Sequence, residues 1–356
     1  MGYDKNQYIH KYPLNMEEEY IKLFEPDYKF KKVNLKVRYL KNCFVNHYGL
    51  VLKNGLLVKG CAPNIGFSSY DESFYYKHWR KAFEQLIVSK YGKSIKSINL
   101  FDNEQYLLIH SPWFSYYFWI TECLPRLLMV KDQLDKLTLI YPESWDNYSF
   151  VTETLEQFPN LKIKRIESDV HLRVKNLVLP EVKPWSPMFI PESVNEVRNF
   201  LFQALDDKMI KSPILTERVY ISRVGAKRRK FSNENSVETL MAKYGFSIVR
   251  MEELSFFEQI ALMRQTKYMT AMTGAGLINI LFMKNGGGFL DLSNEEYKSK
   301  SQYKFHYFKL CNILKIEYAV LFFESEKNDN VDHWSNQDLI ENISKIETGL
   351  NLILNN

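Results

Sequence analysis

Short apolar runs alternate with amphipathic segments throughout the second half of the chain. In these segments apolar residues recur every three or four positions, which is the period of a helix with one buried face. The predicted strands cover 219–222, 246–249, 268–272, 288–292 and 318–323. The predicted helices cover 192–209, 232–244, 256–265, 275–283, 302–314 and 336–354. Regular alternation of this kind predicts parallel βαβ units with right-handed crossovers.

The first half begins with a polar, Tyr-rich arm over 1–30, which contains one short predicted helix at 16–24. Alternating polarity over 36–60 predicts a β-meander, because Asn54-Gly55 suits a hairpin turn in which both residues need positive φ. Further strands are predicted over 106–110, 137–141, 162–166 and 176–179. Further helices are predicted over 72–90, 114–133 and 145–157. The first half is therefore a second α/β region.

Prolines crowd the junction of the two halves. They are Pro180, Pro184, Pro187 and Pro191. So many prolines in a short stretch forbid a regular element and mark either a connection or a domain boundary. We therefore expect an N-terminal α/β domain over 1–190 and a C-terminal Rossmann-like domain over 191–335. A terminal helix over 336–356 follows, one arrangement being that it packs back on the N-terminal domain.

The composition is that of a globular protein long enough for two cores, with 356 residues, of which 46% are hydrophobic and 25% charged. The net charge of +5 is mild, which suits an anionic substrate and argues against nucleic acid as a partner. The four cysteines have no metal-like pairing, and the N-terminus has no apolar signal segment. No apolar run reaches the ~20 residues that span a bilayer. We expect a cytoplasmic protein, at most peripheral to the inner face of a membrane.

A turn of small residues follows the predicted strand 268–272. Small side chains let a ligand phosphate approach backbone N–H groups at the start of a helix. The other interpretation is a tight turn without a ligand, because a lone G-x-G is a weak signal. Asn279 stands where a dinucleotide fingerprint has its third glycine, which argues against an NAD-dependent enzyme. The candidate phosphate-binding residues are Thr273, Gly274, Ala275, Gly276, Leu277 and Asn279.

Cations cluster after the predicted strand 219–222. They are Arg223, Lys227, Arg228, Arg229 and Lys230. Such a run repels itself unless solvent or an anion relieves it, and a solvated run is the common interpretation. This run, however, lies at a strand's carboxyl end, on the same sheet edge as the glycine turn, where open α/β sheets bind ligands. We therefore predict that one or two of the arginines bind a phosphate-bearing small molecule.

Two carboxylates are further candidates. Asp291 lies at the end of an apolar strand, where it either accepts from two vicinal ribose hydroxyls or serves as a cap or loop acid. Glu122 lies one turn from Arg126 on a mostly apolar helix. It is either a half-buried carboxylate that can act as a base near neutral pH, or the acid of an i,i+4 ion pair. From the sequence alone, the ion pair is favoured.

The ordered set of these motifs resembles glycosyltransferase family 61. The matching residues are Trp119 to Leu127, Tyr220 to Arg223, Arg228-Arg229, Asn233-Glu234, Gly245-Phe246, Leu254 to Gln259 and Gly274 to Met283. The resemblance implies a GT-B fold, with two Rossmann-like domains, a cleft between them and the nucleotide in the C-terminal domain. It also implies inverting transfer from a nucleotide sugar without an essential metal or other cofactor. The absence of a D-x-D triplet agrees with the last point.

The resemblance also implies roles for single residues. Arg223, with Arg228 or Arg229, would contact the diphosphate, and the turn Gly274 to Gly276 would cradle it. Asp291 would hold the ribose, and Glu258 would support the site. Glu122 would become the preferred catalytic base, and Asp102 and His110 are the other candidates nearby. Two positions depart from the family, which usually has histidine where this chain has Phe118 and Thr273.

We therefore expect an inverting glycosyltransferase that moves a sugar from a nucleotide sugar, by expectation a UDP-sugar, to a hydroxyl of a surface glycan. The acceptor would be a capsule, lipopolysaccharide or lipid-linked glycan. The alternative is a catalytically inactive nucleotide-sugar-binding partner of a glycan assembly complex, which the two missing histidines support. The aromatic residues over 113–119 would either touch a membrane or lie in a domain core, and the core is favoured.

Overall fold

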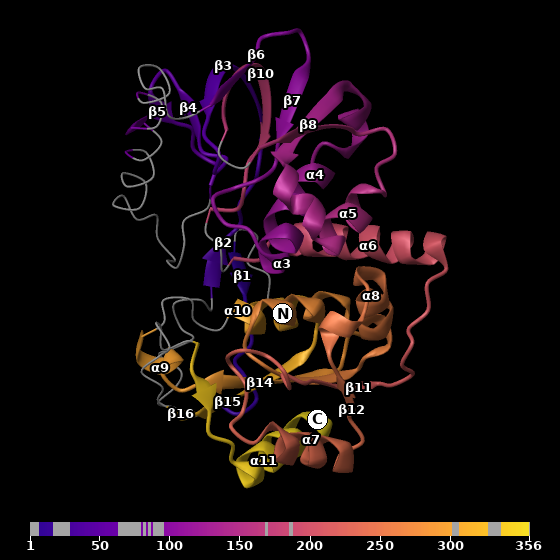
Figure 1. The fold of residues 1–356 in the computed structure, drawn as a ribbon. Coiled ribbons are helices and arrows are strands. Elements are labelled where there is room, and N and C mark those ends of the chain that lie inside the picture. The colour runs from indigo at the N-terminus through magenta and orange to yellow at the C-terminus, as the bar shows by residue number, and fades with distance from the viewer. Residues whose placement is uncertain are drawn as a thin grey trace. The chain divides into compact units, whose positions relative to one another are not determined.

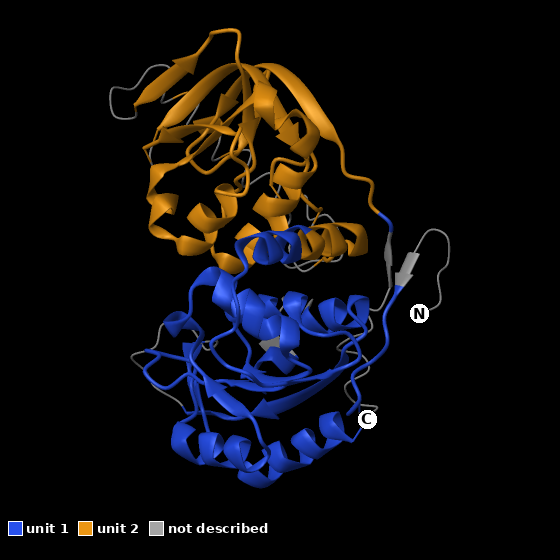
Figure 2. Ribbon diagram, turned by 90° about the vertical axis from the view of Figure 1, so that its right-hand side faces the viewer, with its two compact units in different colours: residues 1–32, 200–356 blue, residues 33–199 orange. Residues whose placement is uncertain are grey.

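The computed structural model describes residues 7–16, 29–62, 80, 83–84, 87, 96–167, 170–184, 188–300, 306–326 and 336–355. The chain forms two compact units (Figure 2). The N-terminal unit is Val33–Asn199, and the C-terminal unit combines Met1–Lys32 with Phe200–Asn356. The division falls inside helix α6 (Pro191–Lys208). The first 32 residues thus group with the C-terminal unit, although their place in the sequence predicts that they belong to the first domain.

The N-terminal unit is built on a mixed eight-stranded sheet in the order β5-β4-β3-β10-β7-β8-β9, in which β6 also pairs with β10. The strands are β3 (Val37–Val45), β4 (Val51–Lys53), β5 (Leu56–Leu57), β6 (Ser97–Leu100), β7 (Gln105–Leu108), β8 (Leu137–Pro142), β9 (Lys162–Ile166) and β10 (His171–Pro180). Strand β10 pairs parallel with β6 and β7 and antiparallel with β3. The predicted meander over 36–60 is confirmed, and its turn has positive φ at Asn54 (52°) and Gly55 (77°).

The predicted helix over 114–133 is divided into four pieces. They are α3 (Tyr116–Phe118), the π-helical turn η1 (Trp119–Cys123), α4 (Leu124–Leu128) and the 3₁₀ segment η2 (Lys131–Lys136). Pro125 explains the π turn, because it has no N–H to donate to the preceding turn. The N–H of Leu124 instead reaches back to Trp119 O, one residue further than in an α-helix. The predicted helix over 145–157 is likewise divided, into η3 (Glu143–Asn147) and α5 (Ser149–Leu155).

The C-terminal unit contains a parallel five-stranded sheet in the order β12-β11-β13-β14-β15, as the alternation of strands and helices predicts. The strands are β11 (Arg218–Ile221), β12 (Ser247–Val249), β13 (Tyr268–Met272), β14 (Gly288–Asn294) and β15 (Glu317–Phe323). The chain runs from β11 to one neighbour and then returns to the other. The switch point of this sheet therefore lies between β11 and β13.

Helices cover both faces of this sheet (Figure 1). Helices α7 (Glu234–Lys243) and α11 (Ile343–Leu354) lie on one face, and α8 (Phe256–Gln265) and α10 (His306–Ile313) lie on the other. Gly349 lets α11 approach the sheet, since an added Cβ would lie 2.8 Å from a methyl carbon of Leu321. Helix α11 therefore packs on the sheet of its own unit, whereas one predicted arrangement has it pack back on the N-terminal domain.

The N-terminal arm lies along the edge strand β15. Leu14 N donates to Tyr318 O at 2.8 Å. The Asn15 side chain accepts from Val320 N at 3.1 Å and donates to Val320 O at 2.5 Å, as a neighbouring strand would. The arm thereby covers an otherwise open sheet edge. Before it, β1 (Gln7–Ile9) pairs with β2 (Lys29–Lys31).

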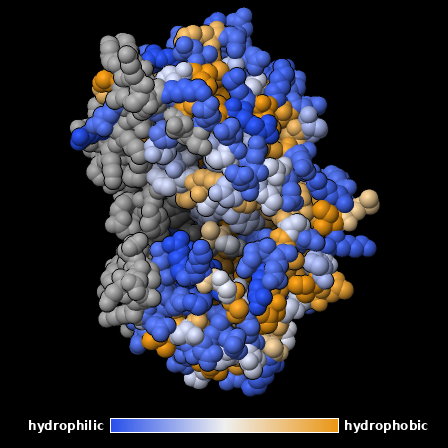
Figure 3. All heavy atoms as spheres, viewed as in Figure 1, coloured by the Kyte–Doolittle hydropathy of each residue, from blue (hydrophilic) through white to orange (hydrophobic). Residues whose placement is uncertain are grey.

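The predicted helices over 16–24 and 72–90 fall almost wholly outside the described residues. Of the helices that are described, none combines the length and the apolar character needed to cross a bilayer. On the face shown in Figure 3, hydrophobic residues are interspersed with polar ones. Within the aromatic stretch 113–119, Trp119 is fully buried, and Phe114 stacks on Trp145 with ring centroids 4.1 Å apart.

Candidate functional site

The basic run and the glycine turn meet at the switch point of the C-terminal sheet. Strand β11 leads into Arg223 and strand β13 leads into Gly274, and the two strands are parallel neighbours with Ile221 opposite Ala271. A Cβ placed on Gly274 would lie 3.7 Å from Nη1 of Arg223. The structure therefore brings together two sets of residues that are about fifty positions apart in the chain, at the place where open α/β sheets bind ligands.

The segment 223–231, called the basic loop from here on, leaves the sheet and returns to helix α7. Its first turn is closed by Ala226 N, which donates to Arg223 O at 2.9 Å. Across the loop, Arg223 Nη2 donates to Arg228 O at 3.1 Å. Positive φ at Gly225 (86°) and at Arg229 (57°) gives the loop its return path, and the second of these is unusual for a residue with a side chain.

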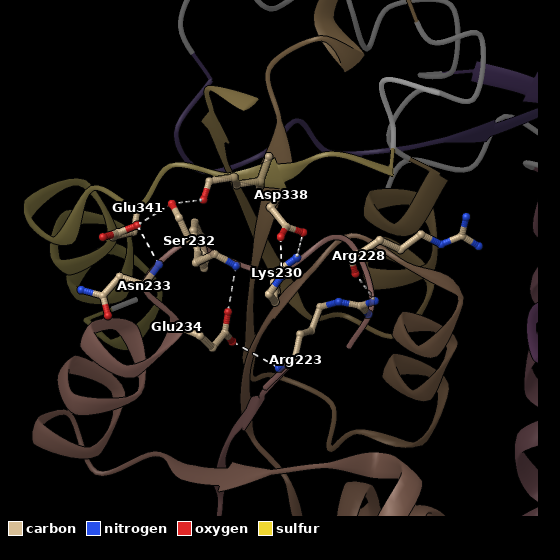
Figure 4. Close-up of polar contacts among 10 residues, drawn as sticks. Arg223, Arg228, Lys230, Ser232, Asn233, Glu234, Asp338 and Glu341 are labelled. Atoms are coloured by element: carbon tan, nitrogen blue, oxygen red, sulfur yellow. Dashed lines mark hydrogen bonds and ion pairs between the residues drawn. The ribbon is translucent and has the colours of Figure 1, made fainter. Parts of the chain in front are cut away.

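Glu234, the first residue of α7, joins the two ends of this loop (Figure 4). Its Oε1 accepts from the Tyr220 hydroxyl at 2.6 Å and from Arg223 N at 3.2 Å. Its Oε2 accepts from Phe231 N at 2.9 Å. The residue is 6% exposed, so these hydrogen bonds form largely away from water. The sequence does not reveal this role, because an acid in the first turn of a helix is common without any tie to a loop.

A second segment, 338–341, fastens the other side of the loop. Lys230 forms an ion pair with Asp338, and Lys230 N also donates to Asp338 Oδ1 at 3.1 Å. Leu339 N donates to Lys230 O, and Ser232 N donates to Leu339 O, both at 2.9 Å. Glu341 Oε2 accepts from the Ser232 hydroxyl at 3.1 Å. The pairing with Asp338 satisfies Lys230 within the protein, which leaves the arginines as the principal candidates for an anion.

The arginines of the loop differ from one another. The Nε atoms of Arg223 and Arg229 are buried, and neither has a hydrogen-bond acceptor among the residues that the structure describes. Burial lowers the pKa of Arg223, and the neighbouring charge of Arg229 lowers it further. Arg228 is exposed, and its side chain extends away from the other labelled residues in Figure 4. Two buried N–H donors without acceptors, on two cations that repel each other, form a site that an anion would satisfy.

The glycine turn presents its small residues to solvent. Ala275 and Gly276 are exposed at the start of the 3₁₀ segment η5 (Ala275–Phe282), which replaces the predicted α-helix over 275–283. A Cβ on Gly276 would meet nothing within 4 Å. The main chain at Gly274 is fixed by the Tyr307 hydroxyl, which donates a hydrogen bond to Gly274 O at 2.8 Å. The turn is therefore open at Gly276, and the guanidinium of Arg223 lies beside Gly274.

Three of the predicted donor-binding residues have structural roles in the described chain. Leu277 is 2% exposed and lies in the core. Asn279 is fully buried, and its Nδ2 donates to Gln259 Oε1 at 3.1 Å, which ties η5 to α8. Glu258 forms a capping box with Ser255 at the start of α8. None of the three presents a free polar group toward the switch point.

Asp291 also differs from its predicted role. It is 2% exposed, and its two oxygens accept from the Thr273 hydroxyl at 2.6 Å and from the Tyr318 hydroxyl at 2.9 Å. Burial raises its pKa from the usual range to about 6. Because both oxygens are occupied and inaccessible, Asp291 cannot hold the two hydroxyls of a ribose in this conformation. It orients Thr273, one of the residues that stand in place of the family histidines.

In the N-terminal unit, Glu122 lies on the π turn η1 and is 1% exposed. Its Oε2 accepts from the Ser111 hydroxyl at 3.3 Å, and its Oε1 lies 3.9 Å from Lys183 Nζ. Ser111 and Lys183 follow the ends of the parallel neighbours β7 and β10, so the group lies at the carboxyl edge of this sheet. The ammonium of Lys183 also lies over the ring of Tyr117, 5.2 Å from its centroid. Nothing in the sequence around Lys183 indicates this pairing.

The ion pair expected between Glu122 and Arg126 is not what holds Arg126. That guanidinium donates to four main-chain carbonyls, those of Leu108, Ile109, His110 and Pro180. The side chain is fully buried, and burial lowers its pKa to about 10. Arg126 therefore holds the ends of β7 and β10 together by hydrogen bonds to their carbonyls. The cation paired with Glu122 is Lys183.

The other two candidate bases are poorly placed. Asp102 lies before the amino end of β7, the edge of the sheet opposite to Glu122, and accepts from the Tyr106 hydroxyl at 2.7 Å. His110 is 1% exposed, and burial, followed by the charge of Arg126, lowers its pKa to about 3. A buried imidazole with so low a pKa is a weak base and is out of reach of an acceptor in solution in this conformation.

Among the described residues, no group of three or more His, Cys, Asp or Glu side chains is arranged to hold a metal ion. A search of curated proteins finds no match to this chain. The family model described as Glycosyltransferase 61 matches residues 116–290, from helix α3 to strand β14. This range includes Glu122, the basic loop and the glycine turn. The family model confirms the resemblance found in the sequence, and residues 116–290 belong to glycosyltransferase family 61.

Proposed function

We propose that this glycosyltransferase moves a sugar from a nucleotide-sugar donor, by expectation a UDP-sugar, to a hydroxyl of a surface glycan, with inversion at the sugar carbon. The acceptor would be a capsule, lipopolysaccharide or lipid-linked glycan on the cytoplasmic side of a membrane. The observation that carries the proposal is the guanidinium of Arg223 beside the glycine turn, together with the buried Nε–H groups of Arg223 and Arg229, which have no acceptor among the described residues. In a GT-B arrangement, the C-terminal unit would bind the donor and the N-terminal unit the acceptor.

A nucleoside diphosphate matches the chemistry of this site. When the bond between the sugar carbon and the phosphate oxygen breaks, the electron pair stays on the diphosphate, whose negative charge grows in the transition state. Guanidinium donors aimed at that charge stabilise it, and they do so without reorganising during the reaction. In this proposal the positive charge of the arginines neutralises the negative charge of the leaving diphosphate, and no metal ion is required.

The N-terminal unit offers one carboxylate for the proton of the acceptor hydroxyl. Glu122 lies at the carboxyl edge of its sheet, and Lys183 balances its charge. In a single displacement, the acceptor oxygen would attack the sugar carbon as the diphosphate departs, and Glu122 would take the proton. Because Glu122 is 1% exposed, this role requires that the unit open around it when the acceptor binds.

The burial of Glu122 is also the observation that favours the second candidate function. A catalytically inactive nucleotide-sugar binder would keep the donor site and need no accessible base. Thr273 stands where the family usually has histidine, and its hydroxyl donates a hydrogen bond to Asp291 Oδ1 at 2.6 Å. This reading predicts that donor binds without release of nucleotide, whatever glycan acceptor is offered.

The proposal can be tested by thermal shift with a panel of nucleotide sugars and free nucleotides, because a ligand that binds only the native state raises the melting temperature. We expect a shift with one nucleotide family, and its loss in Arg223→Ala. Arg264→Ala is the matched control, since Arg264 forms an exposed ion pair with Asp206 at the far end of α8. A wild-type protein that shifts with no nucleotide would contradict the donor site.

Turnover separates the two candidate functions. With the donor identified, nucleotide release would be measured with and without lipid-linked glycan acceptors. For an active enzyme, Arg223→Ala should lower turnover at least ~10²-fold, the scale of one lost donor to a developing oxyanion. Binding of donor without any release would favour the inactive partner.

A further inference from the structure

The basic loop is held in a shape that it would not adopt unaided. Its guanidinium groups repel one another, and Arg229 has positive φ, a conformation that side-chain-bearing residues adopt only when the surroundings enforce it. Left free, such a loop would turn its arginines to solvent and satisfy their N–H donors with water. The ties that prevent this are the hydrogen bonds of Glu234 on one side and the segment 338–341 on the other.

Of these ties, Glu234 is the one that spans the loop. One carboxylate accepts from Arg223 N at 3.2 Å and from Phe231 N at 2.9 Å, and these are the first and last residues of the loop. The Tyr220 hydroxyl, 2.6 Å away, fixes the carboxylate itself from strand β11. We infer that Glu234 is a positioning residue of the donor site, which holds the loop closed so that the guanidinium of Arg223 stays beside the glycine turn and close to Arg229. The inference rests on the proposed nucleotide-sugar site.

Because Glu234 is negatively charged, the direction in which anion affinity changes when it is replaced tests the inference. A carboxylate close to an anion site repels the anion, so electrostatics alone predict that its removal strengthens anion binding. Positioning predicts the opposite, because the loop opens when the carboxylate no longer joins its ends. A role in overall stability predicts neither, since it would change the melting temperature and leave the affinity of the folded protein unaltered.

Two variants separate the effect of side-chain length from the effect of charge. Glu234→Asp keeps the negative charge and suits the first turn of a helix, but it is one methylene shorter and cannot bridge both N–H groups. Glu234→Gln keeps the length, but its amide turns two donors toward one of the N–H groups that the carboxylate accepts from. Glu238→Gln is the matched control, since Glu238 lies one turn later in α7 and, within the described part of the chain, accepts from the Ser222 hydroxyl at 2.6 Å and from neither end of the basic loop.

The probe is inorganic pyrophosphate, titrated by isothermal calorimetry into the full-length chain at low salt, with UDP as a second probe. We expect the dissociation constant for pyrophosphate to rise at least about tenfold in both Glu234 variants, by the scale of one lost hydrogen bond to a charged group. The Glu238→Gln value should equal that of the wild type. Circular dichroism and a melting curve of each variant confirm that the folded protein is what is titrated.

The outcomes distinguish this inference from the proposed function. If wild type binds pyrophosphate, Arg223→Ala loses it and the Glu234 variants bind as wild type does, the positioning role is overturned and the donor site stands. Stronger binding in Glu234→Gln would likewise overturn it, in favour of simple repulsion. If wild type binds neither pyrophosphate nor UDP, the donor site itself fails, and the positioning role fails with it.

Discussion

At the scale of single residues, the acids of this chain mostly hold the protein's own donors. Asp291 and Glu258, which the sequence suggests as ligand contacts, instead accept from Thr273 and from Ser255. Glu234 binds the loop that carries the arginines. A sequence shows where acids lie, but it does not show which hydroxyl or N–H the fold brings within 3 Å of each. The basic run and the glycine turn were predictable, because the ends of parallel strands share one sheet edge.

The pKa of Asp291 leads to a prediction about stability and pH. Burial raises this pKa from 3.8 to about 6, so the folded protein binds the proton more tightly than the unfolded chain. The stability that Asp291 contributes is therefore fully present below about pH 4 and is lost as the pH rises through about 6. Asp291→Asn, which does not titrate, should gain stability relative to wild type over that interval, by up to about 3 kcal/mol at about 1.4 kcal/mol per pKa unit.

Urea unfolding of both proteins at pH 4.5 and pH 7.5, followed by a probe in the C-terminal unit, measures this difference. A constant offset between Asp291→Asn and wild type across the two pH values would show that Asp291 titrates in the folded protein as it does in the unfolded chain.

Lys183 offers a prediction for the N-terminal unit. Lys183→Met leaves Glu122 buried without its cation, and breaking one partner of a buried pair costs about 3–5 kcal/mol. The double variant Glu122→Gln with Lys183→Met should recover much of the loss, since both groups are then neutral.

The matched control for Lys183→Met is Lys131→Met, which breaks an exposed ion pair with Glu196 in the same unit. Exposed pairs contribute little, so this control should unfold as wild type does. Equal losses in the two variants would mean that the contact between Lys183 and Glu122 carries no special stability.

At the scale of elements, periodicity identified the strands and most of the helices, but not how the strands are ordered or where helices break. The parallel strands of the C-terminal unit are confirmed, as is the meander at Asn54-Gly55. The π turn before Pro125 was not predictable, because its cause is one missing N–H within an otherwise regular apolar pattern. That turn matters, since it sets the direction of Glu122, and π turns are frequent at functional sites.

At the scale of the whole molecule, the C-terminal unit is assembled from both ends of the chain. The arm over 10–16 closes the β15 edge, and α11 covers one face of the same sheet. Sequence reasoning assigned the arm to the nearest domain along the chain, since hydrophobic patterns record which face of an element is buried and not which element buries it. The pairing of Asn15 with Val320 is a long-range contact that no local pattern reports.

This assembly predicts that a change in the first sixteen residues loosens the last strand of the sheet. Asn15→Ala removes both hydrogen bonds to Val320 and leaves a partly buried N–H and carbonyl unsatisfied, at a cost of about 1–3 kcal/mol. Hydrogen exchange should therefore accelerate at Val320 and its neighbours in β15, while β7 in the N-terminal unit exchanges as before. Asn147→Ala, which removes a single exposed hydrogen bond to Ser144 O, should change neither. Unchanged exchange in β15 would mean that the arm merely lies on the sheet edge, whereas a local increase would make residues 10–16 an integral part of the C-terminal unit.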